Sequence, residues 1–394
     1  QHRSLYLEMK KFNVLIPMAG KAQRFADAGY RMPKPLIMAK TKRIIDWAMQ
    51  SFDTTDCNII FAIRRDHINN FCIDDILREK FGEDCAMVII EEDTDGSIST
   101  CLLAKDHIDN DVPLFIYTPD VYFEPTFDPN SVGDEDGLIL TFKANSPDHS
   151  YVLLDESGKA LRTAEKQVIS QNAAVGVYYY KTGKMFVKYA ESLVNKNIRT
   201  KNEFYICPMY NLIIRDGYDV RIQQVDKMHV LGTPAELEFF VDNVSYKFGE
   251  KPVALCSDHS GFKTKESMKK ILDEMSIDYI DFGPLTPKDS DYNDFVLQAS
   301  DAINKNICDF GFGFCRTGQG VNILANHIKG IRSALVFDSY TSEMSRRHNC
   351  ANFFAIPEKY VDHECLESIV NTIKSSTFDG GRHMTRMKKT LDLS

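Results

Sequence analysis

PVALCSDHSGF, residues 252–262, is the stretch that decides the fold of the second half of this 394-residue chain. Its apolar first part reads as a buried strand, which a short loop with one glycine and a helix-like segment follow. The first half opens in the same way with NVLIP, residues 13–17, ahead of a glycine-containing loop. Because a strand, a loop and a helix in that order are the repeating unit of α/β proteins, both halves are predicted to be α/β.

Strand-like and helix-like segments alternate regularly through the second half. Strands are predicted at 253–256, 278–282, 308–314, 331–337 and 352–356. Helices are predicted between and after them, at 262–275, 292–305, 318–327, 340–347 and 361–375. This alternation predicts a parallel, doubly wound sheet, which binds ligands at the carboxyl ends of its strands.

The length of the chain exceeds what one ordinary core accommodates, so two domains are expected. A polar stretch with one glycine and one proline, residues 245–252, separates the two strand-led halves. The predicted domains are therefore 10–244 and 251–394. The start of the chain has no signal-peptide core, and Met9 is expected to be the native first residue.

The composition is that of a globular protein, with 43% hydrophobic and 26% charged residues. A net charge of −9 argues against nucleic-acid binding, which needs clustered cations, but permits a locally positive pocket for small anions. No apolar run approaches the roughly 20 residues that span a bilayer. The ten cysteines form no C-x-x-C pair, which disfavours a structural zinc site, and they are interpreted as reduced thiols of a cytoplasmic protein.

Two short motifs in the first half suit phosphate binding. PMAGKAQRF, residues 17–25, leaves a buried strand and enters a turn whose backbone N–H groups can hold phosphate, with Arg24 adding charge. In MPKPL, residues 32–36, Lys34 lies between two prolines that keep the backbone extended. Alone, either motif is more often an ordinary turn, whereas the two in this order are specific.

These motifs, with EDTDGSISTCLLAK at 92–105 and YTPD at 117–120, resemble the sugar-phosphate nucleotidyltransferases over residues 12–240. The resemblance implies a Rossmann-like domain with a mixed sheet and Mg²⁺ as cofactor, and it implies a nucleoside triphosphate and a sugar phosphate as substrates. The implied nucleotide-binding residues are Ala19, Gly20, Arg24, Thr94 and Gly96. Lys34 would stabilise charge at the α-phosphate, Asp120 would hold the metal, and Glu165 and Lys166 would bind the sugar phosphate.

The first half departs from the pattern of that family at two places. Ala22 and Gln23 stand where the family usually has Gly and Ser or Thr. A second metal-binding Asp has no counterpart near Leu231 and Gly232, and the nearest acid along the chain is Asp226. The fold prediction survives both departures, and they bear on catalysis alone.

Five segments of the second half carry polar residues at predicted strand ends or helix starts. They are SDHSGFK at 257–263, DYND at 291–294, GFCRTGQG at 313–320, RHNCAN at 347–352 and FDGGRHMTR at 378–386. Separately, His259 or His348 would be a structural histidine, and Cys315 would be a core residue. Together, and in this order, the five segments resemble the ribose-5-phosphate isomerase B family over residues 252–390, a family that includes the galactose-6-phosphate isomerase subunits.

That resemblance implies isomerisation without a metal or an organic cofactor. Cys315 would remove the proton next to the carbonyl to give a cis-enediolate, its thiolate favoured by the N-terminus of the following helix. Backbone N–H groups of that loop would stabilise the enediolate oxygens. His348 and Thr317 would open the sugar ring. The remaining implied substrate-binding residues are Asp258, His259, Tyr292, Arg316, Gly318, Gly320, Asn349, Lys359, Arg382 and Arg386. Because the family builds its site across a dimer interface, a homodimer is expected.

This half also departs from its family. Arg316 replaces a small Gly beside the catalytic loop, Asn293 replaces a common Pro, and Lys359 stands where an Arg usually helps bind phosphate. A lysine keeps the charge but loses the bidentate geometry. Arg316 and Lys359 therefore suggest a substrate other than ribose 5-phosphate.

The leading hypothesis is a bifunctional enzyme that supplies an activated sugar, for example for a surface polysaccharide. The alternative is an active isomerase whose first domain has lost catalysis and binds a nucleotide or sugar phosphate as a sensor or dimerisation module. A nicotinamide-dependent dehydrogenase is excluded because neither glycine loop has the G-x-G-x-x-G spacing.

Overall fold

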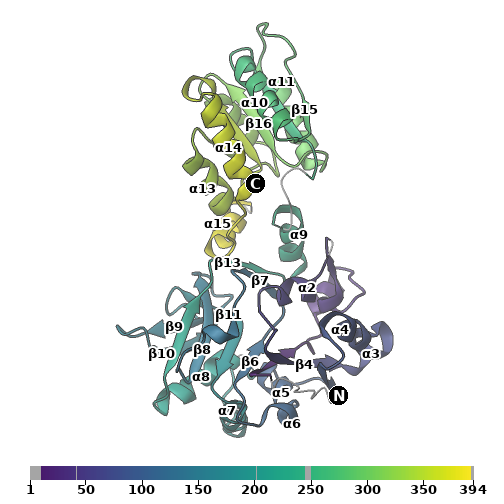
Figure 1. The fold of residues 1–394 in the computed structure, drawn as a ribbon, viewed down its shortest axis with the longest axis vertical. Helices are drawn as coiled ribbons and strands as arrows, with labels where there is room; N and C mark the ends of the chain where they lie inside the picture. Colours follow the sequence, from purple (N-terminus) through teal and green to yellow (C-terminus); the bar gives the residue numbers. More distant parts are fainter. Residues whose placement is uncertain (1–9, 41, 201, 245–249, 392–394) are drawn as a thin grey trace, which may run out of the picture. The chain divides into compact units, whose positions relative to one another are not determined.

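The computed structural model describes residues 10–40, 42–200, 202–244 and 250–391 (Figure 1). The chain forms two compact units, Gln1–Phe240 and Val241–Ser394. Most of the predicted boundary stretch, residues 245–249, lies outside the described residues. Among the helices of the described chain, none is both long and apolar enough to cross a membrane.

The first unit is built on one mixed sheet of nine strands. They are β1 (Phe12–Pro17), β4 (Cys57–Arg64), β5 (Ala86–Ile90), β6 (Leu114–Tyr117), β8 (Gly137–Lys143), β9 (Ser150–Leu154), β10 (Ala160–Glu165), β11 (Asn172–Tyr180) and β12 (Val220–Gln224). Their order is β10-β9-β11-β6-β1-β4-β5, and β8 lies on β11 with β12 beside it. Strands β6, β1, β4 and β5 run parallel, whereas β11 runs antiparallel to β6. The expected mixed sheet is confirmed.

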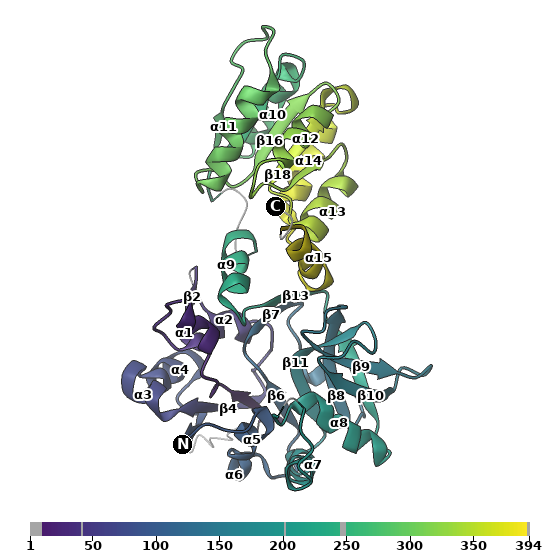
Figure 2. The ribbon, with the colours of Figure 1, turned by 180° about the vertical axis from the view of Figure 1, so that it is seen from behind.

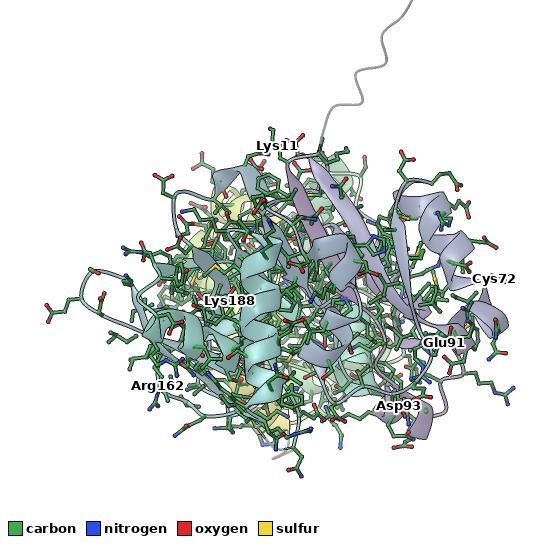
Figure 3. All side chains as sticks on the ribbon, turned by 90° about the horizontal axis from the view of Figure 1, so that it is seen from below. Lys11, Cys72, Glu91, Asp93, Arg162 and Lys188 are labelled. Carbon is green, nitrogen blue, oxygen red and sulfur yellow. The ribbon has the colours of Figure 1, made fainter. Side chains whose placement is uncertain are left out.

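Helices and short strands complete the first unit. The helices are α1 (Gln23–Asp27), α2 (Ile44–Met49), α3 (Arg65–Phe71), α4 (Ile73–Phe81), α5 (Ser97–Leu102), α6 (Lys105–Ile108), α7 (Gly183–Asn195), α8 (Ile206–Arg215) and α9 (Pro234–Asn243). A separate antiparallel pair joins β7 (Val121–Glu124) to β13 (Lys227–Val230), and β2 (Met38–Ala39) pairs with β3 (Lys42–Arg43). Helix α7, marked by Lys188 in Figure 3, packs its buried side chains into the same core cluster as Leu15 and Ile116 of the sheet.

Both faces of the central strands are buried, which explains why β1 reads as a continuous apolar run. Leu15 packs into one core cluster, whereas Val14 and Ile16 pack into the cluster on the opposite face. Side chains alternate between the faces of a strand, so a strand covered on both sides carries no polar alternation.

The second unit is a parallel five-stranded sheet in the order β15-β14-β16-β18-β17. The strands are β14 (Val253–Ser257), β15 (Tyr279–Asp281), β16 (Gly311–Cys315), β17 (Ser333–Leu335) and β18 (Phe353–Pro357). The helices are α10 (Phe262–Glu274), α11 (Tyr292–Asn304), α12 (Gln319–Asn326), α13 (Ser339–Asn349), α14 (His363–Ser375) and α15 (Gly381–Leu391). Helices α10 and α14 pack on one face, and α11 and α12 on the other (Figures 1 and 2). The predicted doubly wound parallel sheet is confirmed.

Most boundaries in the second unit differ from the sequence prediction by one or two residues, and the strand predicted at 331–337 is shorter at both ends, as β17. Two of the differences have a clear local reason. Strand β16 begins at Gly311 rather than at residue 308, because the N–H of Cys308 bonds back to the carbonyl of Ala302 in a turn. Helix α13 continues to Asn349 rather than ending at residue 347, and Cys350 ends it in a left-handed conformation (φ 48°). His348 and Asn349 therefore lie in the last turn of a helix.

Candidate active sites

A cavity of about 710 Å³ opens in the first unit where the carboxyl ends of β1 and β6 meet. Its walls are the loop after β1, Lys34, the segment around Thr94, the turn at Asp120, Glu203 and Gly232. This volume is within the usual range for a small-molecule site. The structure brings together all seven residues that the sequence assigned to nucleotide, catalysis and metal in this unit: Ala19, Gly20, Arg24, Lys34, Thr94, Gly96 and Asp120.

The loop after β1 keeps a conformation that usually requires glycine. Ala22, which replaces the glycine of the family pattern, has φ 50° and forms the N-cap of α1. Left-handed backbone is strained for alanine, so the surrounding structure imposes it. Lys21 of this loop forms an ion pair with Asp93 at 2.5 Å, and Arg64 holds the other oxygen of Asp93 at 2.8 Å. Lys21 and Asp93 line the cavity, although sequence reasoning did not select them.

A second ion pair within the cavity joins Lys34 to Asp120. The extended backbone predicted at Lys34 is wrong, because Lys34 begins a 3₁₀ turn that runs to Leu36 and is closed by hydrogen bonds to the carbonyls of Pro33 and Lys34. Asp120 lies in the turn between β6 and β7. The Lys34 ammonium lies 3.1 Å from Oδ2 of Asp120. Both side chains keep contact with solvent, at 21% and 39% exposure. A carboxylate on a cavity wall is a donor that suits Mg²⁺, which prefers oxygen ligands.

The segment around Thr94 packs closely against the chain before α8. Gly96 has φ 118°, and a Cβ at this position would lie 2.7 Å from the backbone nitrogen of Phe204. Phe204 in turn donates its N–H to the carbonyl of Asp95 at 2.9 Å. The Thr94 hydroxyl bonds the Thr100 hydroxyl at 2.6 Å. Only glycine fits at residue 96. The cavity wall at this position is therefore formed by backbone atoms rather than by a side chain.

Glu165 and Lys166 do not belong to the described lining of the cavity. Glu165 ends β10 and accepts a hydrogen bond from the Ser150 hydroxyl. Lys166 has φ 54°, and its ammonium lies 5.7 Å from the centre of the Tyr205 ring. Their assignment to the sugar phosphate stays a prediction. Glu203, in the loop between α7 and α8, does line the cavity.

The second candidate site lies at the carboxyl edge of the sheet in the second unit. Cys315 is the last residue of β16 and is 5% exposed. The chain then turns through Arg316 and Thr317, both exposed, into Gly318, which caps α12 with φ 71°. A Cβ on Gly318 would lie 2.4 Å from the Leu335 side chain. The backbone around Cys315 is therefore held against neighbouring strands, with its N–H groups at the start of a helix.

Three further predicted residues pack against this loop. The Asp258 N–H donates to the carbonyl of Phe314, and its carboxylate accepts from the N–H of Gly261 at 2.8 Å. A Cβ on Gly320 would lie 2.5 Å from the Tyr292 hydroxyl, so that phenol covers the first turn of α12. The N–H of Lys359 donates to the carbonyl of Arg316 at 3.3 Å. We call Cys315, the Arg316–Gly320 loop, Asp258, Tyr292 and Lys359 the thiol cluster.

His259 lies at the exposed side of the same strand end. Its Nδ1 is 3.0 Å from a carboxylate oxygen of Asp289 and 3.2 Å from the carbonyl of Ser290. Asp289 itself is almost fully exposed, so this pair adds little to stability. The contacts tie the loop that precedes α11 to the end of β14.

The other predicted residues gather where α13 and α15 lie side by side (Figures 1 and 2). The rings of His348 and His383 stack with centroids 4.1 Å apart and planes 5° apart. The Arg382 Nε donates to Nε2 of His383 at 3.3 Å, and Arg347 binds both oxygens of Asp379. We call these five residues the histidine cluster. Arg386, one turn after Arg382 on α15, and the exposed Asn349 lie at its edge.

The histidine cluster combines a spacing that suits a metal ion with arginines that favour an anion. His348, Asp379 and His383 hold ligand atoms within 4.8 Å of one another, a spacing that also suits a metal. Burial first, then the neighbouring His348 and arginines, lower the pKa of His383 to about 4, and burial lowers the pKa of His348 as well. Both imidazoles are thus neutral near pH 7, and the net charge of the surroundings comes from arginines, which attract phosphate.

The depressed pKa of His383 gives a pH prediction. The ordinary pKa of histidine is 6.5, so between about pH 6.5 and 4 His383 is protonated in the unfolded chain but not in the folded chain. The free energy of unfolding is therefore at its full value above pH 6.5 and falls as the pH is lowered towards 4. The loss is roughly 2 kcal/mol after allowance for solvent screening. We expect the His383→Asn variant to lose less of its unfolding free energy over the same pH range, because asparagine does not titrate there.

The measurement is urea unfolding of the second unit, followed by circular dichroism at pH values on both sides of that window. Fluorescence is unsuitable because the single tryptophan, Trp47, lies in the first unit. His327→Asn, at an exposed histidine, is the matched control and should keep the pH dependence of the parent protein. An equal slope in the His383 variant and the parent would contradict the prediction.

Sequence reasoning left Arg347, Asp379 and His383 out of the site. Two of them lie beside a residue that it did select, since His383 follows Arg382 and Arg347 precedes His348, whereas Asp379 lies three residues before Arg382. Among the described residues, no hydrogen bond or ion pair joins the thiol cluster to the histidine cluster. The two clusters are therefore separate in their polar contacts within one chain.

Comparisons with known proteins separate the two units. Residues 253–390 match the protein-family model described as Ribose/Galactose Isomerase. YwlF of Bacillus subtilis (strain 168) is 36% identical over 141 residues, which are 36% of this chain and 95% of that protein. Ribose-5-phosphate isomerase B of Escherichia coli (strain K12) is 32% identical over 138 residues, which are 35% of this chain and 93% of that protein.

A solved structure resembles the first unit. The nucleoside-diphosphate-sugar pyrophosphorylase from Vibrio cholerae RC9 aligns with a TM-score of 0.51 at 22% identity, covering 58% of this chain and 99% of that one. At this identity the likeness shows a shared fold, and the mixed sheet described above is that fold.

Proposed function

Since this chain belongs, through residues 253–390, to the Ribose/Galactose Isomerase family, we propose that it is a bifunctional enzyme of phosphorylated sugars. The second unit interconverts an aldose and a ketose phosphate. The first unit transfers a nucleotide from a nucleoside triphosphate to a sugar phosphate with the help of Mg²⁺. The enzyme acts in the cytoplasm, in the supply of nucleotide sugars for surface polysaccharide.

The isomerase proposal rests on the position of Cys315 at the carboxyl end of β16, directly before the N-terminus of α12. The thiolate takes the proton from the carbon beside the carbonyl, and the electron pair moves to the carbonyl oxygen to give a cis-enediolate. N–H groups of the loop from Arg316 to Gly320 stabilise those oxygens. A proton then moves from the hydroxyl oxygen to the former carbonyl oxygen, and the Cys315 thiol returns its proton to the former carbonyl carbon. These two transfers complete the exchange of carbonyl and hydroxyl and restore the thiolate.

Ring opening and phosphate binding need the histidine cluster. His348, with Thr317, moves the proton that opens the sugar ring, and Arg382 and Arg386 bind phosphate as charge-assisted donors. A homodimer supplies the histidine cluster of one copy to the thiol cluster of the other, which is consistent with the separation of the two clusters in one chain. Asp258, His259, Asn349 and Lys359 contact the substrate in this arrangement.

The transferase proposal is carried by the cavity in which the loop after β1, Lys34 and Asp120 converge. A phosphate oxygen of the sugar phosphate attacks the α-phosphorus, and the bond to pyrophosphate breaks. Mg²⁺, when bound through Asp120, neutralises charge on the phosphates. The N–H groups of the loop and Arg24 bind the triphosphate, and Lys34 stabilises charge at the α-phosphate. The second candidate, a first unit that binds these ligands without catalysis, is kept because Ala22 replaces a glycine.

One experiment separates the two candidates. The protein is incubated with Mg²⁺, with each of CTP, UTP, GTP, dTTP and ATP, and with a panel of sugar phosphates, and pyrophosphate release is measured. Release with one pairing identifies the nucleotide and the sugar. If no pairing releases pyrophosphate while aldose–ketose interconversion is present, the first unit is a binding domain.

A further inference from the structure

Helix α15 carries both arginines that are assigned to the substrate phosphate, and it is joined to the rest of the second unit by a flexible connection. The chain enters α15 through Gly380 and Gly381, which have φ 65° and 51°. Glycine restricts its backbone less than any other residue, so two in succession allow the helix to change direction. Of the α15 side chains whose burial the structure describes, two are buried, His383 and Met387. The direction of α15 therefore depends on what fixes its start.

An ion pair fixes the chain directly before these two glycines. Arg347, in the last turn of α13, donates from Nε to Oδ1 of Asp379, and its Nη2 lies 3.1 Å from Oδ2. The N–H of Asp379 also donates to the carbonyl of Arg347 at 2.9 Å. The Asp379 side chain is 9% exposed. A bidentate pair fixes direction as well as distance, so Asp379 is held against the end of α13.

The third nitrogen of the same guanidinium has a partner of a different kind. Nη1 of Arg347 donates to Oε1 of Glu343, one turn earlier on α13, at 2.9 Å. This bond lies within one helix, whereas the pair with Asp379 joins α13 to the start of α15 (Figures 1 and 2). The two acidic partners of Arg347 therefore differ in what they connect, which makes Glu343 a matched control for Asp379.

The contacts that follow Asp379 along the chain depend on where α15 begins. The ring of His383 stacks on His348 with centroids 4.1 Å apart, and the Arg382 Nε donates to Nε2 of His383 at 3.3 Å. Because these residues belong to the first turn of α15, a shift of Asp379 would move the stacked ring and Arg382 together. Arg386 lies one turn further along the same helix and would move with them.

We propose that Arg347 is a positioning residue of the isomerase unit. By holding Asp379 it fixes the start of α15, and it thereby sets the place of Arg382 and Arg386 relative to the substrate phosphate. The inference deepens the isomerisation proposed above and rests on it. Position matters at this precision because a displacement of about 1 Å, caused far from the reacting atoms, can cost roughly a hundredfold in rate.

Asp379→Asn separates positioning from a simple effect of charge. The substitution removes a negative charge from the histidine cluster, and electrostatics alone would then strengthen the binding of a phosphate. Positioning predicts the opposite, because an amide cannot hold both nitrogens of the guanidinium as a carboxylate does. We therefore expect Asp379→Asn and Arg347→Met to weaken phosphate binding alike, although one removes a negative charge and the other a positive charge.

The first measurement is the steady-state kinetics of aldose–ketose interconversion by the full-length protein. In Asp379→Asn and Arg347→Met, KM for the phosphosugar and the inhibition constant of inorganic phosphate should each rise roughly tenfold, with kcat within about threefold of the parent value. Glu343→Gln removes the same charge from the partner within α13 and should change KM by no more than about twofold. Arg347→Lys keeps the charge without the bidentate geometry, so its KM should lie between those of Arg347→Met and the parent.

The second measurement is hydrogen–deuterium exchange, which reports the docking of α15 independently of catalysis. Amides of residues 382–390 should exchange roughly tenfold faster in Arg347→Met and Asp379→Asn, because the start of the helix is released. Exchange in strands β14 and β16 should match that of the parent protein, and Glu343→Gln should match it throughout. Thermal unfolding followed by circular dichroism shows that each variant is folded.

A lower KM in Asp379→Asn would overturn the positioning role and make Arg347 a direct ligand of the phosphate. A lower kcat at unchanged KM would indicate a smaller folded fraction, which is a merely structural role and also overturns the inference. Parental exchange of α15 in Arg347→Met would overturn the docking. If α15 exchanges faster as expected but the parent protein interconverts no phosphosugar, the docking stands and the proposed isomerase function fails. If the parent protein is active and both variants keep its KM, the function stands and the inference fails.

Discussion

Cys315→Ala is expected to lower the rate of aldose–ketose interconversion by roughly 10²–10⁴-fold, the usual contribution of a positioned proton-transfer group. Alanine removes the only sulfur at the carboxyl end of β16 and leaves the loop backbone in place. The loss should therefore fall on kcat rather than KM, because the enediolate N–H groups and phosphate-binding residues remain. Interconversion is measured with the aldose or ketose phosphate that the substrate panel identifies.

The matched control is Cys256→Ala on the neighbouring strand β14. Cys256 is fully buried, and burial raises the pKa of its thiol, so it stays protonated and outside the reaction. This variant should retain activity close to that of the parent protein. Pyrophosphate release by Cys315→Ala should also be unchanged, since that chemistry belongs to the other unit. Interconversion that survives in Cys315→Ala would remove the thiolate from the mechanism.

Asp120→Asn is expected to reduce pyrophosphate release by roughly 10²–10³-fold, because metal charge stabilisation of several kcal/mol depends on this carboxylate. The substitution also leaves the Lys34 ammonium without its 3.1 Å partner inside the cavity. An amide of the same shape binds Mg²⁺ far less well than a carboxylate, so raising the Mg²⁺ concentration should recover part of the lost rate.

Asp226→Asn is the control for the loss of one negative charge. Asp226 is exposed in the turn between β12 and β13 and is outside the described lining of the cavity. We expect this variant to release pyrophosphate at the rate of the parent protein, and the Asp120 variant to keep its isomerase activity. A parental rate of pyrophosphate release in Asp120→Asn would exclude Asp120 as the metal ligand.

Local sequence patterns predicted the elements of the second unit closely, because each strand, loop and helix start is indicated by residues that are neighbours in the sequence. An apolar run such as residues 253–256 can be buried on both faces only in a covered parallel strand, and the glycine at residue 261 ends the loop that follows. The differences arose at ends. At Gly311 a turn shortened the strand, and at Cys350 a left-handed residue extended the preceding helix beyond its predicted end.

The first unit shows what a linear pattern leaves open. The resemblance selected Lys34 and Asp120, which are 86 residues apart, and the fold brings them into contact. It also selected Glu165 and Lys166, which the described cavity does not include. The strand order places β1 between β6 and β4, so the loop after β1 and the turn after β6 share one edge. That order depends on packing between distant segments and has no local signature.

The sequence alone determined the α/β class, the parallel sheet of the second unit, and the residue types at the ends of its strands, because periodicity and loop chemistry are local properties. Only the tertiary structure decided which side chains meet. It stacked His383 on His348, placed Lys21 on Asp93, and brought Lys34 into contact with Asp120. Such meetings depend on strand order, on helix placement and on the direction of each side chain, which are fixed only when the whole core packs.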